Sequence, residues 1–235
     1  MNIGFKISKG DIFKKITRPY YLLKAVNKNK VFCIGLNKTG TTSLKKAMMD
    51  LNFLVGDQRD AELLFDDWVK RDFRSLIKYC KTAAFFQDSP FSLPYTFIAM
   101  DQAYPGSKFI LTVRDNPEQW YNSLINYHSK LWGNGNVPPT SEDLKNATYI
   151  YKGSAYHHRM HVHNVTDDEP YKKDVLLEYY VTHNKVVEDY FRFRQNNLLI
   201  LNVSHKDAYK KLTNFLNVKT NKTEFPWENK TSKKQ

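Results

Sequence analysis

The chain contains little cysteine, and this scarcity excludes two classes of protein. Its 2 cysteines, Cys33 and Cys80, are too few for a disulfide framework and show no metal-ligand spacing. Cys33 lies in an apolar run and Cys80 follows Tyr79. We therefore expect two buried thiols and no metal site.

Long apolar runs are missing as well. No stretch is long and apolar enough to span a bilayer, and the first residues lack the apolar core of a signal peptide. A glycan at the sequon that begins at Asn37 would block the anion-binding motif described below. These observations predict a soluble, cytoplasmic protein without a transmembrane segment.

Acidic residues are in deficit: 24 Asp and Glu face 36 Lys and Arg, a formal net charge of +12. This charge indicates attraction to nucleic acid, anionic lipid or a highly charged small molecule, without choosing among them. With 235 residues, of which 41% are hydrophobic, the chain can bury one sizeable core. One domain with insertions is the expected organisation.

The chain is organised around the stretch KVFCIGLNKTGTTSL, residues 30–44. Val31 to Leu36 is a short apolar run typical of a buried strand, and the apolar residues take helical spacing from Thr42 onward. Gly35 and Gly40 are expected to adopt positive φ angles between the two elements. Successive N–H groups would then point into one concavity at a helix N-terminus.

This turn carries side chains that suit an anion. Asn37 lies within it, and Lys38 adds a mobile cation. The hydroxyl donors are Thr39, Thr41, Thr42 and Ser43. A nucleotide-triphosphate loop would place its lysine directly after the second glycine, whereas here the lysine precedes Gly40. The turn therefore suits a phosphate or a sulfate but departs from that motif.

The rest of the chain alternates between apolar strands and amphipathic helices. Further strands are predicted at 83–87, 108–113 and 198–203, and helical spacing recurs in 57–80, 94–103, 117–131, 171–195 and 208–215. This alternation predicts an α/β fold, a three-layer domain around a central, mostly parallel sheet. Asp88 and Arg114 each follow a strand, so they should lie beside the 35–43 turn at one rim of the sheet.

The string GLNKTGTTSL resembles the 5′-phosphosulfate loop of sulfotransferases that use 3′-phosphoadenosine 5′-phosphosulfate (PAPS). The resemblance extends from about Lys30 to Lys230 and includes FPWENK near the C-terminus, which implies a cofactor contact from Lys230. A second element, FILTVRDNPEQWYNSL, looks like the family's arginine and serine that grip the 3′-phosphate. The resemblance assigns these roles to Arg114 and Ser123. Asn122 stands where the family's serine usually falls, so either Ser123 or Asn122 is expected to make the contact.

The resemblance implies in-line transfer of a sulfuryl group from PAPS to a hydroxyl or amine, with 3′-phosphoadenosine 5′-phosphate (PAP) as product and no metal. Lys38 would stabilise the leaving phosphate. Asp88 is the candidate general base, although an Asp before Ser-Pro is equally typical of a turn cap. Three histidines of the 132–170 insert are alternative bases: His157, His158 and His161.

The predicted domain covers 30–230, with 132–170 as a lid or acceptor-binding insert. Residues 1–29 are predicted to be a basic arm packed on the core, and 231–235 a frayed tail. The acceptor is expected to be a small molecule or carbohydrate, and no specific nucleic acid is indicated. A kinase and a non-catalytic nucleic-acid-binding protein are the alternative functions. Neither acceptor identity nor oligomeric state follows from the sequence.

Overall fold

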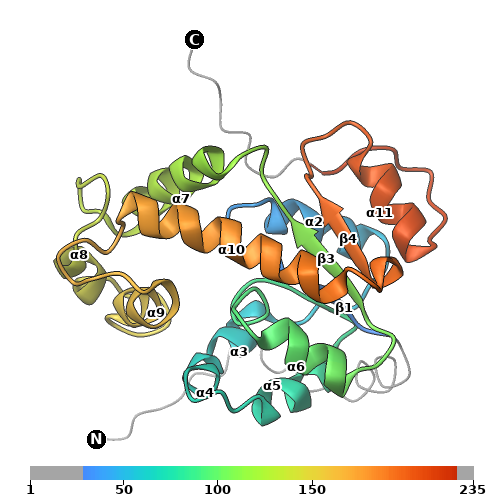
Figure 1. Cartoon of the computed structure of the whole chain (residues 1–235), viewed down its shortest axis with the longest axis horizontal. Helices are drawn as coiled ribbons and strands as arrows, with labels where there is room; N and C mark the ends of the chain where they lie inside the picture. Colours follow the sequence, from blue (N-terminus) through green and yellow to red (C-terminus); the bar gives the residue numbers. More distant parts are fainter. Residues whose placement is uncertain (1–28, 227–235) are drawn as a thin grey trace, which may run out of the picture.

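The protein is represented by a computed structural model that describes residues 29–226 (Figure 1). The predicted arm at 1–29, except Asn29, therefore lies outside the described residues, as do Lys230 and the tail at 231–235. Within the described part, no helix combines the length and the apolar character needed to cross a bilayer.

The centre of the fold is a sheet of four parallel strands in the order β2-β1-β3-β4. The strands are β1 (Val31–Cys33), β2 (Phe85–Phe86), β3 (Lys108–Thr112) and β4 (Leu198–Leu201). In the register, Val31 pairs with Phe85 on one side and with Lys108 on the other. The predicted α/β fold with a parallel sheet is confirmed, and each strand is shorter than the apolar run that predicted it.

Helices connect the strands and cover the sheet. They are α2 (Thr41–Asp50), α3 (Gln58–Glu62), α4 (Phe65–Val69), α5 (Arg74–Tyr79), α6 (Thr96–Ala103), α7 (Pro117–Trp132), α8 (Ser141–Asn146), α9 (Ser154–His163), α10 (Lys173–Phe191) and α11 (Ala208–Leu216). The stretch 57–80 forms three short helices rather than one, since Leu63, Leu64 and the residues from Lys70 to Phe73 break the helical backbone.

The alternation of side chains along β1 divides the core into two layers. Val31 and Cys33 pack with α2 and α11 on one face, whereas Phe32 and Ile34 pack with α5, α6 and α10 on the other. Figure 1 shows α10 crossing the sheet on the face opposite α2. Both cysteines are buried, as predicted.

The insert between α7 and α10 forms a separate layer at one end of the sheet (Figure 1). Its helices α8 and α9 pack against α7 and α10 through an apolar cluster that includes Leu36 and Trp120. Tyr149 docks the insert on α3, where its hydroxyl donates to Glu62 Oε1 at 2.9 Å. This part of the chain therefore stands close to the turn that follows β1.

Candidate functional site

Three segments that follow strands meet at one edge of the sheet. Residues 34–40 follow β1, Asp88 follows β2 and Arg114 follows β3. Because the strands are parallel, their carboxyl ends lie at the same edge. The structure thus brings together the residues that the sequence predicted to share a rim.

Side chains hold the carbonyl groups of the turn after β1. The pairs are Ile34 O with His183 Nε2 at 2.8 Å, Leu36 O with Thr39 Oγ1 at 2.5 Å, Asn37 O with Trp120 Nε1 at 2.9 Å and Lys38 O with Arg114 Nε at 2.6 Å. A peptide's C=O and N–H point in opposite directions, so the N–H group that follows each carbonyl points away from the side chain that holds it. These four contacts preorganise the backbone of the turn.

The two glycines of the turn serve different purposes. Gly40 has φ 100, as predicted, and a β-carbon there would lie 2.3 Å from Val203 Cγ2. The prediction of a positive φ at Gly35 is wrong; besides Gly40, the residue of the turn with a positive φ is Lys38, at 67. Gly35 is needed for space, since its backbone lies against Thr112 of β3.

The N-terminus of α2 faces the same turn. The helix begins at Thr41, after Gly40, and no side chain caps it. The N–H groups of a first helical turn have no partner inside the helix, and the dipole makes this end positive. Thr42 is exposed there, whereas Thr41 and Ser43 are buried. Together with the turn, this end of α2 can bind a phosphate or a sulfate.

The hydroxyl of Thr39 is not available to a ligand, contrary to prediction. Thr39 is fully buried, and its Oγ1 lies 2.5 Å from Leu36 O and 2.6 Å from Thr112 Oγ1. These hydrogen bonds join the turn to β3. Any contribution of Thr39 to anion binding must therefore come from its backbone.

Several cations surround the turn. The ammonium of Lys38 lies 3.4 Å from the centroid of the Tyr127 ring. Burial lowers the pKa of Lys38, and the charges of Arg114 and Lys130 lower it further, although Asp88 opposes them. An anion placed among these groups would relieve their mutual repulsion.

Arg114 is joined to the turn and not to the neighbouring acids. Its Nε donates to Lys38 O, while Asp115 pairs with His205 at 3.2 Å and Glu118 with Lys173 at 2.9 Å. Arg114 is therefore not engaged in a surface ion pair with Asp115 or Glu118.

Helix α7 distinguishes between the two candidates for the 3′-phosphate contact. Trp120 and Tyr127 of this helix both touch the turn. Successive residues of a helix are about 100° apart, so Ser123 lies within about 60° of both, and Asn122 lies about 140° or more away. Ser123 is partly buried and Asn122 is exposed. The geometry favours Ser123. The signal lay in the sequence, as aromatic residues three before and four after Ser123.

A cavity opens beside the turn, between it and the insert. The residues that line it are Leu36, Asn37, Asp88, Ser89, Ser92, Leu93, Trp120, His158, Val162, His163 and Tyr179. It thus joins the anion-binding turn to helix α9 and to the loop after β2. Trp120 and Tyr179 were not identified from the sequence, because their role depends on contacts with distant residues.

Asp88 faces this cavity and also shapes the loop that contains it. Its Oδ1 accepts the N–H of Ser89 at 3.0 Å, and its carbonyl accepts that of Ser92 at 3.0 Å. Burial raises the pKa of the Asp88 carboxyl, and hydrogen bonds and the charge of Lys38 oppose the rise only in part. A raised pKa makes this carboxylate a better proton acceptor than an exposed one.

Of the three candidate histidines, only His158 lines the cavity. Burial and the charge of Arg159 lower the pKa of His158 to about 3, so its neutral ring is a weak base. His157 is hydrogen-bonded to Tyr151 at 2.7 Å, and His161 lies against His157 O at 2.9 Å. In residues 29–226, no group of three or more His, Cys, Asp and Glu side chains is placed to hold a metal ion. His183 is a buried core histidine whose Nε2 is hydrogen-bonded to Ile34 O.

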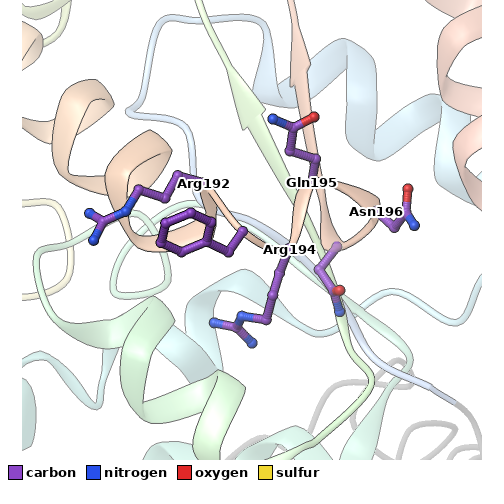
Figure 2. Close-up of a pocket in the computed structure, with 6 residues that line it drawn as sticks. Arg192, Arg194, Gln195 and Asn196 are labelled. Carbon is purple, nitrogen blue, oxygen red and sulfur yellow. The ribbon is translucent and has the colours of Figure 1, made fainter.

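A second hollow lies far from the turn, at the end of α10, and Figure 2 shows its side chains. It is formed by residues 192–197, which lead into the amino end of β4 and so lie at the opposite edge of the sheet. Arg194 pairs there with Asp101 at 2.8 Å. This hollow shares no residue with the cavity beside the turn.

A parallel sheet whose first strand leads through an anion-binding turn into a helix defines a P-loop-like α/β protein. The profile of the sulfotransferase domain matches residues 30–234, and the chain belongs to this sulfotransferase family. A comparison with curated proteins found no match.

Proposed function

We propose that the protein transfers a sulfuryl group from PAPS to a hydroxyl or amine of a small-molecule or carbohydrate acceptor. The observation that carries the proposal is the turn at 34–40, whose carbonyls are held by side chains so that its N–H groups and those of α2 can receive the 5′-phosphosulfate. The match to the sulfotransferase domain supports this use of the turn.

The residues present fit the donor's charges. The phosphosulfate would bind to the turn and the start of α2, through Asn37, Lys38, Thr39, Gly40, Thr41, Thr42 and Ser43. Arg114 and Ser123 would hold the 3′-phosphate, and Lys130 would add positive charge. Lys230, the remaining predicted contact, stays a prediction.

The proposed reaction is an in-line displacement. The acceptor oxygen forms a bond to sulfur while the bond from sulfur to the bridging oxygen of the 5′-phosphate breaks, and PAP leaves with that electron pair. Lys38 and the turn amides stabilise the charge that grows on the bridging oxygen. The acceptor's proton passes to the Asp88 carboxylate. Asp88 suits this role because it lines the cavity beside Asn37 and its pKa is raised.

The acceptor would enter the cavity between the turn and α9. Residues from 132–170 contribute His158, Val162 and His163 to its wall, which supports the predicted acceptor-binding role of the insert. Trp120, which is fully buried, and Tyr179 are aromatic members of its wall.

Thermal unfolding with PAP, PAPS, or ATP and Mg²⁺ tests the donor. A ligand at a hundredfold excess over its dissociation constant stabilises the folded state by about 2.7 kcal/mol. PAP and PAPS should raise the melting temperature of the wild type and of Arg192→Ala, a matched control whose side chain lies in the distant hollow (Figure 2). Lys38→Ala and Arg114→Ala should respond much less.

Release of PAP in an acceptor screen then tests the transfer itself. Stabilisation by ATP with Mg²⁺ alone would overturn the proposal in favour of a kinase. Binding of an oligonucleotide that falls steeply with salt and is not displaced by PAP would instead support nucleic-acid binding.

A further inference from the structure

Arg159 is a buried cation without a counter-ion. The side chain belongs to α9 and is only 3% exposed. Among residues 29–226, the groups that interact with its charge are tyrosines, Tyr171 foremost, and no carboxylate is among them. Its Nη1 atom has no hydrogen-bond partner there. A buried guanidinium in this condition is costly, because it has lost water without gaining an opposite charge.

The neighbours of Arg159 do not supply the missing charge. Nη2 lies 3.0 Å from Nδ1 of His128, and the guanidinium stacks on the Tyr171 ring at 4.2 Å. Burial is the main cause that lowers the pKa values of His128, His158 and His163, with Arg159 as a further cause. These rings are therefore neutral at pH 7. The cluster carries one positive charge, that of Arg159.

This charge lies next to the acceptor cavity. Val162 and His163 line the cavity, and both lie one turn after Arg159 on the same face of α9. Tyr179, across the cavity on α10, has a buried hydroxyl without a hydrogen-bond partner. Arg159 also acts electrostatically on Tyr179. Two unused donors thus stand near the cavity: the Tyr179 hydroxyl at its wall, and Nη1 of Arg159, one helical turn before the lining residues Val162 and His163.

We propose that the acceptor carries an anionic group, a carboxylate or a sulfate, which binds to Nη1 of Arg159 and the hydroxyl of Tyr179. This inference rests on the proposed function and names its substrate class: a hydroxylated acid or an acidic sugar. The anion would complete the hydrogen bonds of both donors and neutralise the buried charge. The acceptor's reacting hydroxyl would then face the turn and Asp88 on the opposite side of the cavity.

The arginines of the distant hollow show why burial matters for this inference. Arg192 and Arg194 are exposed, and Arg194 is paired with Asp101 (Figure 2). Water and a carboxylate already satisfy these two cations, so they create no need for an anionic ligand. Arg159 has neither.

Matched acceptor pairs provide the test. Calorimetry on the full chain with saturating PAP would compare D-glucuronate with D-glucose, and 4-hydroxyphenylacetate with 4-hydroxyphenylacetamide. The acidic member of at least one pair should bind tenfold or more tightly than its neutral partner. PAP binding is measured first. If PAP does not bind, the proposed donor is wrong, and this result is distinguished from a failure of the acceptor proposal.

Variants identify the group that recognises the charge. Arg159→Met keeps most of the side-chain volume and should bring the ratio of the acidic to the neutral acceptor's affinity close to one. Arg159→Lys should restore part of this acid preference. Tyr179→Phe removes one hydroxyl and should lower the preference without affecting PAP affinity, even if Arg159→Met fails to fold. Arg192→Met is the control with an unchanged preference.

Three results would overturn the proposal. The first is that the neutral acceptors bind as tightly as the acidic ones, and the second is that no acidic acceptor binds to the PAP complex. The third is that the preference for the acid survives in both Arg159→Met and Tyr179→Phe. A merely structural Arg159 would change the melting temperature and leave the acid preference intact.

Discussion

Gly35 and Thr112 lie so close that a β-carbon on Gly35 would stand 2.1 Å from Thr112 Oγ1 and 2.4 Å from its carbonyl oxygen. The contact joins the start of the anion-binding turn to the end of β3. The hydroxyl of Thr112 is also hydrogen-bonded to that of Thr39 in the turn. The position of the turn above the sheet therefore depends on the absence of a side chain at residue 35.

Gly35→Ala should destabilise the protein because the backbone of β3 cannot move aside. Overpacking of this kind costs about 1–3 kcal/mol, and more where backbone is struck. The measurement is the free energy of unfolding in urea. Gly106→Ala measures the cost of a left-handed φ without crowding, since φ is +81 at this site and no atom lies within 4 Å of the added carbon. A Gly35→Ala variant as stable as the wild type would show that crowding against Thr112 is unimportant.

Trp120→Phe should weaken PAP binding while preserving the fold. The change removes the hydrogen bond from Nε1 to Asn37 O but leaves a ring to stack on Tyr180. An unsatisfied buried carbonyl costs about 1–3 kcal/mol, so we expect roughly a tenfold to hundredfold loss of affinity if the turn rearranges. Titration calorimetry with PAP measures it. Trp132→Phe, on the same helix, should bind PAP as the wild type does.

Ser123→Ala should lower the affinity for PAP more than the affinity for AMP, which lacks the 3′-phosphate. A hydrogen bond to a charged group contributes about 1.5–3 kcal/mol, equivalent to at least a tenfold change. Asn122→Ala should change neither affinity, because the residue faces away from the turn. A larger effect of Asn122→Ala would reverse the assignment.

Asp88→Asn should separate stability from activity. Burial raises the pKa of Asp88 above its ordinary value of 3.8, so the folded protein holds this proton more firmly than the unfolded chain does. The wild type therefore loses stability as pH rises from the ordinary pKa through the raised one. The variant avoids this loss, and asparagine tolerates the φ of 61 at this position.

The melting temperature of Asp88→Asn should exceed that of the wild type near neutral pH, and the difference should disappear in acid. Sulfuryl transfer should fall by about 10²–10⁴ through loss of the general base. PAP affinity should change little. A fully active variant would remove Asp88 from the reaction and leave His158 as the candidate base.

Local sequence signals predicted the features that depend on neighbouring residues. The helix predicted at 117–131 begins with residue types that favour a helix start: Asn116 caps α7 by accepting the N–H of Gln119 at 2.8 Å, and Pro117 occupies the first turn. The four strands and the shared rim followed from apolar runs in the same way.

Features that depend on distant partners could not be predicted. The role of Gly35 is set by Thr112, and the hydroxyl of Thr39 is used by the same residue. Trp120 reads as a core residue of an amphipathic helix until its Nε1 is seen to reach Asn37. Arg159 lies among histidines in a polar insert, and only tertiary structure shows that it is buried without an acid.

The side chains that hold the turn's carbonyls come from far along the chain: Arg114 is separated from Lys38 by 76 residues, Trp120 from Asn37 by 83, and His183 from Ile34 by 149. Such contacts have high sequence separation and form late, after the loops between them have closed. We expect the turn to acquire its full set of contacts only after α10 has docked on the sheet. Competence to bind the donor should therefore be the last property acquired during folding, and a nascent chain that ends before α10 should lack it.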